Sequence, residues 1–92
     1  MIVSYADRDT QHLAEGYRVQ RFIAFEKVAR RKLRQLQIAS DLEDLRVPPG
    51  NRLERLQGNW WGYMSIRINE QWRICFKWTQ SGPAEVQIID YH

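Results

Sequence analysis

The chain has 92 residues and a mass of 11.1 kDa, which is enough for one domain and too little for two hydrophobic cores. Apolar residues make up 43% and charged residues 27%, a globular composition that argues against disorder. The one cysteine, Cys75, excludes an internal disulfide and a multi-cysteine zinc site, and no apolar run approaches the roughly 18 residues of a membrane span. We therefore expect a single cytoplasmic domain over residues 1–92 that does not enter a membrane.

The positive charge is concentrated in one segment. The net charge of the whole chain is +3, but residues 17–39 carry seven Lys or Arg against one Glu, a net +6. Such a segment indicates a polyanion or an acidic protein as a partner, although a solvated helix face has the same appearance.

The first half of the chain has helical patterns. Residues 2–5 are β-prone and predict a short edge strand, and acidic start residues followed by a glycine predict a helix over residues 9–15. Residues 19–39 contain no Gly or Pro and predict one longer helix. Its apolar stripe consists of Phe22, Phe25, Ala29, Leu33 and Leu36. The capping-box pattern over residues 40–43 predicts another short helix.

The second half has β patterns. Residues 61–68, 72–78 and 84–91 alternate or are β-rich, and residues 79–83 form the expected loop between the last two strands. Helices followed by strands predict an α+β fold, with two N-terminal helices packed on one face of a small antiparallel sheet.

Burial fixes the expected register of the first hairpin. A two-residue loop at positions 69–70 would mix apolar and polar side chains on both faces, whereas a three-residue loop over 69–71 makes one face fully apolar. We therefore expect the three-residue loop. It pairs Ile68 with Trp72, Ile66 with Ile74 and Met64 with Phe76 on one face, and Arg67 with Arg73, Ser65 with Cys75 and Tyr63 with Lys77 on the other.

That register places Arg67 directly opposite Arg73, with Lys77 nearby. Like charges at opposed positions destabilise a sheet, and the guanidinium group suits phosphate because it donates parallel hydrogen bonds. The pair predicts an anion site on the open sheet face, and the alternative is a solvated polar face without a ligand.

The end of the sequence, Asp90-Tyr91-His92, offers acid–base chemistry, since a histidine exchanges protons near neutral pH and Asp90 can orient its ring. The alternative is a frayed polar terminus. Among the aromatic residues, Trp60 and Trp61 at a turn are candidates for stacking on bases, whereas Trp72 is expected in the core.

Several stretches together resemble the HigB and GraT type toxins of the RelE/ParE superfamily. They are Pro48–Glu54, Gly58, the run Ser65–Phe76 and Asp90–His92. The resemblance implies a RelE-like fold and a ribosome-dependent mRNA endonuclease that cuts the message in the ribosomal A site and inhibits translation. It further implies a HigA-type antitoxin with a helix-turn-helix, operator DNA bound only through the toxin–antitoxin complex, and no metal or other cofactor.

The resemblance also implies roles for individual residues. Arg73 would stabilise the phosphate, His92 would be the acid or base, and Asp90 and Tyr91 would position His92 or the nucleotide. Arg67 would be a second phosphate contact, in a set of substrate-binding residues that further contains Gln71, Gln57 and Arg55.

One position departs from the family pattern. Relatives often have a lysine where this chain has Gln57, so we expect weaker catalysis than in lysine-bearing relatives, or compensation by Arg55 or Arg67.

Other functions stay open on the sequence. A ParE-type toxin that acts on gyrase would have the same fold without an RNA-cleaving site, a non-catalytic RNA- or ribosome-binding module would need only the basic helix and exposed aromatics, and a degraded toxin would only bind its antitoxin.

Overall fold

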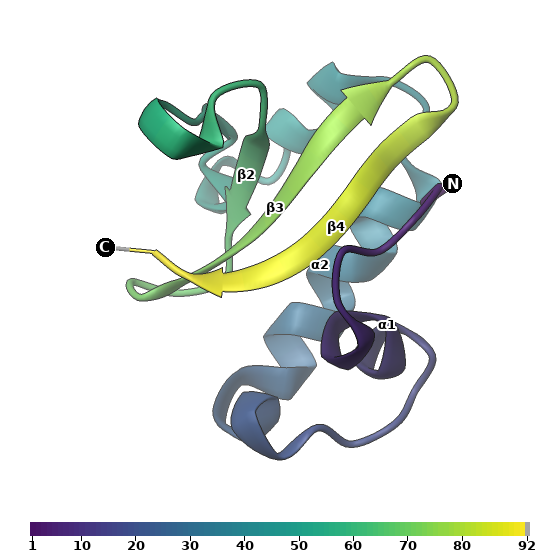
Figure 1. Ribbon diagram of the computed structural model, residues 1–92, viewed down its shortest axis with the longest axis vertical. Coiled ribbons are helices and arrows are strands. Elements are labelled where there is room, and N and C mark those ends of the chain that lie inside the picture. The colour runs from purple at the N-terminus through teal and green to yellow at the C-terminus, as the bar shows by residue number, and fades with distance from the viewer. Residues whose placement is uncertain (92) are drawn as a thin grey trace.

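A computed structural model describes residues 1–91 and shows a four-stranded antiparallel sheet backed by helices (Figure 1). The strands follow the spatial order β1-β2-β3-β4. Their bounds are β1 Glu54–Arg55, β2 Met64–Arg67, β3 Trp72–Thr79 and β4 Gly82–Asp90. Because each strand pairs with the next one along the chain, the sheet is a simple meander.

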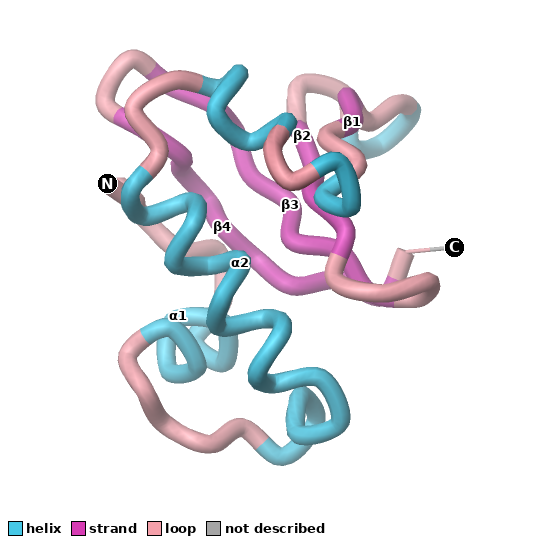
Figure 2. The backbone as a smooth tube through the Cα atoms, turned by 180° about the vertical axis from the view of Figure 1, so that it is seen from behind, coloured by secondary structure: helices cyan, strands magenta, loops and turns pink. Residues whose placement is uncertain are grey.

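In Figures 1 and 2, α2 crosses behind the strands of this sheet, and α1 lies between α2 and the edge strand β4. The two α-helices are α1 Arg8–Ala14 and α2 Glu26–Ile38. The 3₁₀ turns are η1 Gln20–Phe25, η2 Leu42–Arg46, η3 Pro49–Asn51 and η4 Gly58–Trp60. The predicted α+β fold with two N-terminal helices on one sheet face is confirmed. Within residues 1–91, no helix has the length and apolar character needed to cross a membrane.

The expected single helix over residues 19–39 is wrong in its first third, where the chain forms η1 before α2 begins. A 3₁₀ turn aligns residues three apart. Phe22 and Phe25 therefore both enter the core, where their rings lie 6.0 Å and 5.1 Å from the Trp72 ring. Packing against Trp72 thus takes precedence over a continuous α-helix.

The predicted capping box is displaced by one residue. Asp41 accepts a hydrogen bond from the Glu43 amide, and Asp44 accepts from the amides of Ser40 and Asp41. The capped element is the 3₁₀ turn η2, which begins at Leu42 rather than at residue 40.

The predicted apolar stripe of the helices and the inward face of the sheet form one core. Its helical members include all five stripe residues, and Ile66, Ile74, Phe76, Val86 and Ile88 contribute from the strands. Their alternation along the strands leaves a second, open face on the other side of the sheet.

The predicted hairpin register is confirmed, since Ile66 pairs with Ile74 and Arg67 with Arg73. The loop over residues 69–71 forms because the Asn69 side chain accepts hydrogen bonds from the amides of Gln71 and Trp72, both at 2.8 Å. The second loop is shorter than expected: Thr79 already pairs with Gly82, so only residues 80–81 turn. Gly82 permits this turn through its φ of +125°, and a Cβ there would lie 2.3 Å from the Met1 carbonyl oxygen.

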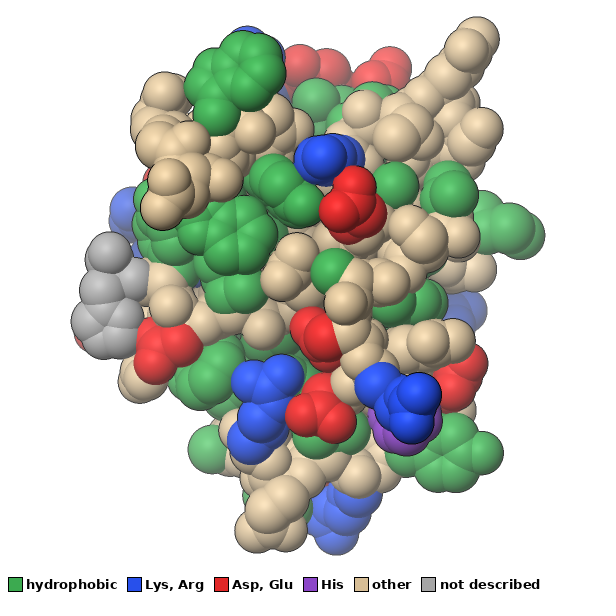
Figure 3. Space-filling model, viewed as in Figure 1, with side chains coloured by type: hydrophobic (Ala, Val, Ile, Leu, Met, Phe, Trp, Pro, Cys, Tyr) green, Lys and Arg blue, Asp and Glu red, His purple; other side chains and the backbone are tan. Residues whose placement is uncertain are grey.

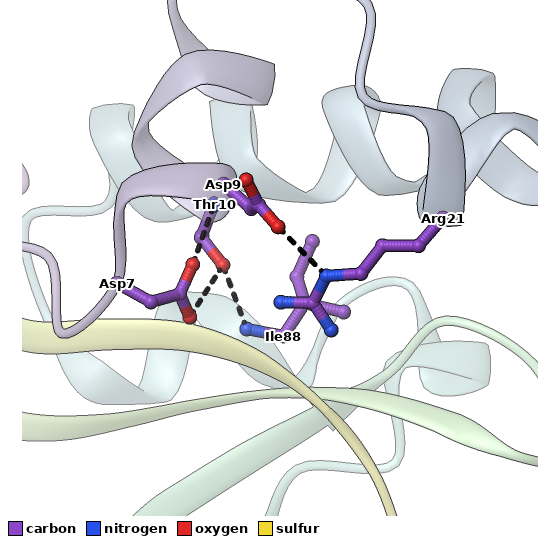
Figure 4. A network of polar contacts seen from close by, with 5 residues as sticks. All are labelled: Asp7, Asp9, Thr10, Arg21 and Ile88. Carbon is purple, nitrogen blue, oxygen red and sulfur yellow. Dashed lines mark hydrogen bonds and ion pairs between the residues drawn. The ribbon is translucent and has the colours of Figure 1, made fainter.

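The N-terminal segment protects the free edge of β4. The expected strand over residues 2–5 reduces to one parallel bridge between Tyr5 and Val86, but the amides of Val3 and Ala6 still donate to carbonyls of β4. Further along, the Thr10 hydroxyl accepts a hydrogen bond from the Ile88 amide at 3.0 Å and donates one to the Asp7 carboxylate (Figure 4). The first ten residues therefore satisfy backbone groups that an exposed edge would leave open.

Candidate functional site

Three of the predicted site residues, Gln71, Asp90 and Tyr91, are in contact where the first hairpin loop lies beside the end of β4. The Gln71 side chain donates to the Asp90 carboxylate at 2.9 Å, and the Tyr91 amide donates to the Gln71 carbonyl at 2.8 Å. Arg67 ends β2 at the same hairpin. The hairpin loop thus joins Gln71, Asp90 and Tyr91 at the end of the sheet where Arg67 also lies, but Asp90 pairs with Trp72 and so lies on the sheet face opposite to Arg67 and Arg73; His92 lies outside the described residues.

Arg73 lies one step inward on the open face and is 9% exposed. Its Nε donates to the Ser65 hydroxyl at 2.7 Å, and one terminal nitrogen donates to the Arg52 carbonyl at 2.8 Å. The Glu54 carboxylate lies 3.8 Å from the same nitrogen. The guanidinium group is therefore held in one orientation before any ligand arrives.

The two opposed arginines do not form a clamp in this structure, although their register is the predicted one. Arg67 Nε donates to the Asn69 carbonyl at 3.1 Å, and a terminal nitrogen lies 3.9 Å from the exposed carboxylate of Glu70. Each guanidinium group thus has its own partners, and this separates like charges that the register alone would oppose.

A buried lysine on α2 adds a further cation near Arg67 and Arg73. Lys32 is buried, and its ammonium group donates to the Asn51 side-chain oxygen at 2.7 Å. Burial lowers the pKa of Lys32, and the positive charges of Arg31, Arg67 and Arg73 lower it further.

Asn51 makes two further hydrogen bonds besides the one that it accepts from Lys32. Its fully buried amide also donates to the Gln35 side chain at 2.8 Å and to the Leu45 carbonyl at 3.1 Å. Because the next residue, Arg52, supplies the carbonyl that Arg73 contacts, the turn at η3 joins Lys32 to Arg73. The sequence analysis missed Lys32, although its helical spacing from Ala29 and Leu36 is a signal that it faces inward.

The far end of the open face has a separate polar group. Lys77 lies 3.3 Å from the Glu85 carboxylate and over the Tyr63 ring, and the Tyr63 hydroxyl donates to Glu85 at 3.1 Å. Between the two ends lies the buried Cys75, whose pKa burial raises to about 12. A thiol of this kind is a packing group and not a nucleophile.

The remaining predicted residues do not join this arrangement. Arg55 pairs in register with Met64, so it lies on the sheet face opposite to Arg73. Gln57 is exposed at the start of η4. Of the two stacking candidates, Trp61 is 79% exposed, whereas Trp60 packs edge-on against Tyr63. Trp72 is partly buried and packs against the core, on the side predicted for it.

The open face is mixed in character. Figure 3 shows basic side chains scattered among acidic and apolar ones on this side of the molecule. Across the described chain, no three His, Cys, Asp or Glu side chains gather as metal ligands. The predicted site residues at this end of the sheet offer guanidinium groups, an amide, a carboxylate and a phenol.

A small antiparallel meander backed by two helices, with arginines on its open face, is the architecture of RelE-like toxins. The sequence model of the family described as "RelE-like toxin of type II toxin-antitoxin system HigB" matches residues 5–92. The chain is 38% identical over 94 residues to Toxin HigB-1 of Vibrio cholerae serotype O1, an alignment that covers 100% of this chain and 98% of that toxin. It is also 40% identical over 52 residues to an uncharacterized protein of Haemophilus influenzae, covering 56% of this chain and 52% of that protein.

The chain therefore belongs to the HigB family of toxins from type II toxin–antitoxin systems. A toxin of such a system has an antitoxin as its partner.

Proposed function

We propose that this toxin is a metal-independent endoribonuclease that cuts mRNA in the ribosomal A site and so inhibits translation. The observation that carries the proposal is the contact of Gln71 with Asp90 and Tyr91 at the end of the sheet where the opposed arginines Arg67 and Arg73 also lie. These residue types match what the reaction requires, and family membership supports the same reading.

The reaction is attack of a 2′-hydroxyl on the adjacent 3′ phosphate. A base takes the hydroxyl proton, cations stabilise the charge of the phosphorane, and an acid protonates the leaving 5′ oxygen. In this proposal Arg73 stabilises the phosphorane and Arg67 contacts the phosphate. His92 is the acid or the base, while Asp90, Tyr91 and Gln71 position it or the nucleotide.

The surroundings of Arg73 support its role in a specific way. Ser65 and the Arg52 carbonyl fix the guanidinium group, so little reorganisation is needed when charge develops on the phosphate. The Glu54 carboxylate, about half exposed, is the anion already beside Arg73 and would compete with an incoming phosphate. Removing that charge with Glu54→Gln is therefore expected to strengthen RNA binding.

The cellular setting follows from the same proposal. The toxin acts in the cytoplasm on ribosomes, a HigA-type antitoxin with a helix-turn-helix neutralises it, and operator DNA is bound only through the toxin–antitoxin complex. Gln57 and Arg55 are the weaker members of the proposed substrate-binding set, because Arg55 lies on the sheet face opposite to Arg73 and Gln57 is exposed at the start of η4.

The test is translation-coupled cleavage with programmed 70S ribosomes and a known A-site codon, read by primer extension. Untagged wild type is expected to cut at that codon, and His92→Ala and Arg73→Ala are expected to abolish the cut while ribosome binding persists. Binding without a wild-type cut would favour a non-catalytic ribosome-binding module. Neither binding nor cutting, together with inhibition of DNA supercoiling, would favour a gyrase inhibitor.

The departure at position 57 has its own test. Gln57→Lys is expected to raise the cleavage rate, since it returns a cation to the position where relatives have one. An unchanged rate in single-turnover measurements would remove Gln57 from the substrate-binding set.

A further inference from the structure

The outer side of α2 carries a row of basic residues that the candidate site does not use. Lys27, Arg31 and Arg34 are all exposed and follow a spacing of four and three residues, which places them on one face of the helix. Ile38 continues the same face by one turn and is 68% exposed. We call these four residues the α2 ridge.

The cations of the ridge differ from their neighbours in having no carboxylate partner among residues 1–91. In the same basic segment, Arg21 pairs with Asp9 at 2.8 Å, and Arg18 and Arg30 both approach Glu26. Arg30 also donates to a backbone carbonyl, that of Tyr17, at 2.8 Å. Arg30 thus connects α2 to neighbouring segments of the chain, whereas the three ridge cations point into solvent.

A groove with four apolar and two polar lining residues continues the ridge beyond its last turn. The groove has a volume of about 210 Å³, and its walls include Ile38 and Val47, which is 72% exposed. The buried residues Leu45 and Ala39 line it as well, and so do the polar side chains Gln35 and Asp44. Exposed apolar side chains at one hollow that buried apolar residues also line are typical of a protein-binding surface.

The position of the ridge separates it from the candidate site. The inward side of α2 packs on the core face of the sheet, so its outer side faces away from the open face that carries Arg73 (Figures 1 and 2). A partner on the ridge would therefore leave the open face uncovered.

We propose that the α2 ridge and its groove bind an acidic amphipathic segment of the antitoxin, with carboxylates against Lys27, Arg31 and Arg34 and an apolar side chain in the groove. A phosphate backbone would satisfy the three cations but would gain nothing from Ile38 and Val47, and this favours a protein over RNA. The proposal rests on membership of a type II toxin family and not on RNA cleavage, so the two fail separately.

The experiment measures the affinity of the full-length antitoxin of this system for toxin variants by isothermal titration calorimetry. Arg34→Glu is expected to weaken binding about tenfold or more, because it places a carboxylate against the acidic segment. The matched control is Arg8→Glu, the same reversal at an exposed arginine on α1, with an expected change of less than about twofold. Arg31 is avoided because its charge acts on the buried Lys32.

The groove is tested independently by Val47→Ser, which removes apolar surface at an exposed position and is also expected to weaken binding several-fold. Thermal unfolding checks that each variant is folded, and Arg34→Gln replaces Arg34→Glu if the reversal destabilises the domain, with a smaller loss in the same direction. The salt dependence of binding should become shallower in both Arg34 variants.

Equal affinity of the antitoxin for wild type, Arg34→Glu and Val47→Ser would overturn the proposal. So would a loss confined to 70S ribosome binding, which would make the ridge an RNA surface. If the wild-type toxin binds antitoxin but does not cut mRNA, the ridge proposal is still tested by the same titrations, and only the nuclease proposal fails.

Discussion

Two groups of basic residues in this domain have opposite surroundings. Arg73 and Lys32 are buried, and each is fixed by hydrogen bonds to uncharged groups, whereas Lys27 and Arg34 are exposed without a carboxylate partner in the described chain. A buried cation needs its partners because desolvation is costly, while an exposed cation is satisfied by water. The buried group therefore belongs to the fold as much as to any reaction, and the exposed group is available for binding.

Asn51→Ala is expected to have the largest effect on stability. It removes the side chain that accepts the hydrogen bond of Lys32 among residues 1–91 and leaves an uncompensated buried ammonium group, at a cost of about 3–4 kcal/mol in the free energy of unfolding. Urea denaturation measures this loss.

The matched variant is the double substitution Lys32→Met with Asn51→Leu, which removes both partners. It is expected to recover at least half of the lost stability, because no buried charge is left unpaired. A double variant as unstable as Asn51→Ala would show that the Lys32 contact is not what makes Asn51 important.

Arg73→Leu is expected to destabilise the domain by about 2–3 kcal/mol, since the Ser65 hydroxyl and the Arg52 carbonyl lose a charged donor. Arg73→Lys keeps the charge but cannot reach both acceptors, so an intermediate loss is expected. A loss below about 0.5 kcal/mol for Arg73→Leu would contradict a structural role and leave Arg73 as a purely functional residue.

Cys75, two residues after Arg73 in β3, is expected to make the free energy of unfolding depend on pH. Burial raises the pKa of its thiol from 9.0 to about 12, so the unfolded chain releases this proton first. Its contribution to stability is fully present below pH 9.0 and is lost as pH rises toward 12, with a difference of about 1 kcal/mol at pH 10. Denaturation of wild type and Cys75→Ala across pH 8–10.5 measures it, and parallel pH profiles would contradict it.

The smallest effect is expected on the ridge. Lys27→Gln and Arg34→Gln should change the free energy of unfolding by no more than about 0.5 kcal/mol, because neither cation has a partner to lose. Losses comparable with that of Arg73→Leu would show that the ridge supports the fold and would remove the distinction between the two groups.

The sequence was sufficient where burial alone decides the structure. The hairpin register followed from placing Ile66 and Ile74 on one face, because a shift by one residue would expose every apolar side chain of the hairpin. The opposed arginines and the inward Trp72 followed from that register.

Details that depend on contacts between distant segments were not predictable. The break between η1 and α2 depends on how Phe22 and Phe25 meet Trp72. Asn51 follows Pro48, Pro49 and Gly50, and nothing in the local sequence shows that Lys32 and Leu45 converge on it. In the same way, the separate partners of Arg67 and Arg73 come from Asn69 and Arg52, which the strand pattern does not place.

The closing of the β4 edge by the N-terminal segment has a consequence for how the toxin is made. The Ile88 amide is satisfied by Thr10, 78 positions earlier in the chain, and β4 also binds Val3 and Ala6. Contacts of such long sequence separation form late, and during synthesis they must wait for the last strand to leave the ribosomal exit tunnel. During synthesis the N-terminal segment therefore stays without these hydrogen-bond partners until β4 itself has emerged.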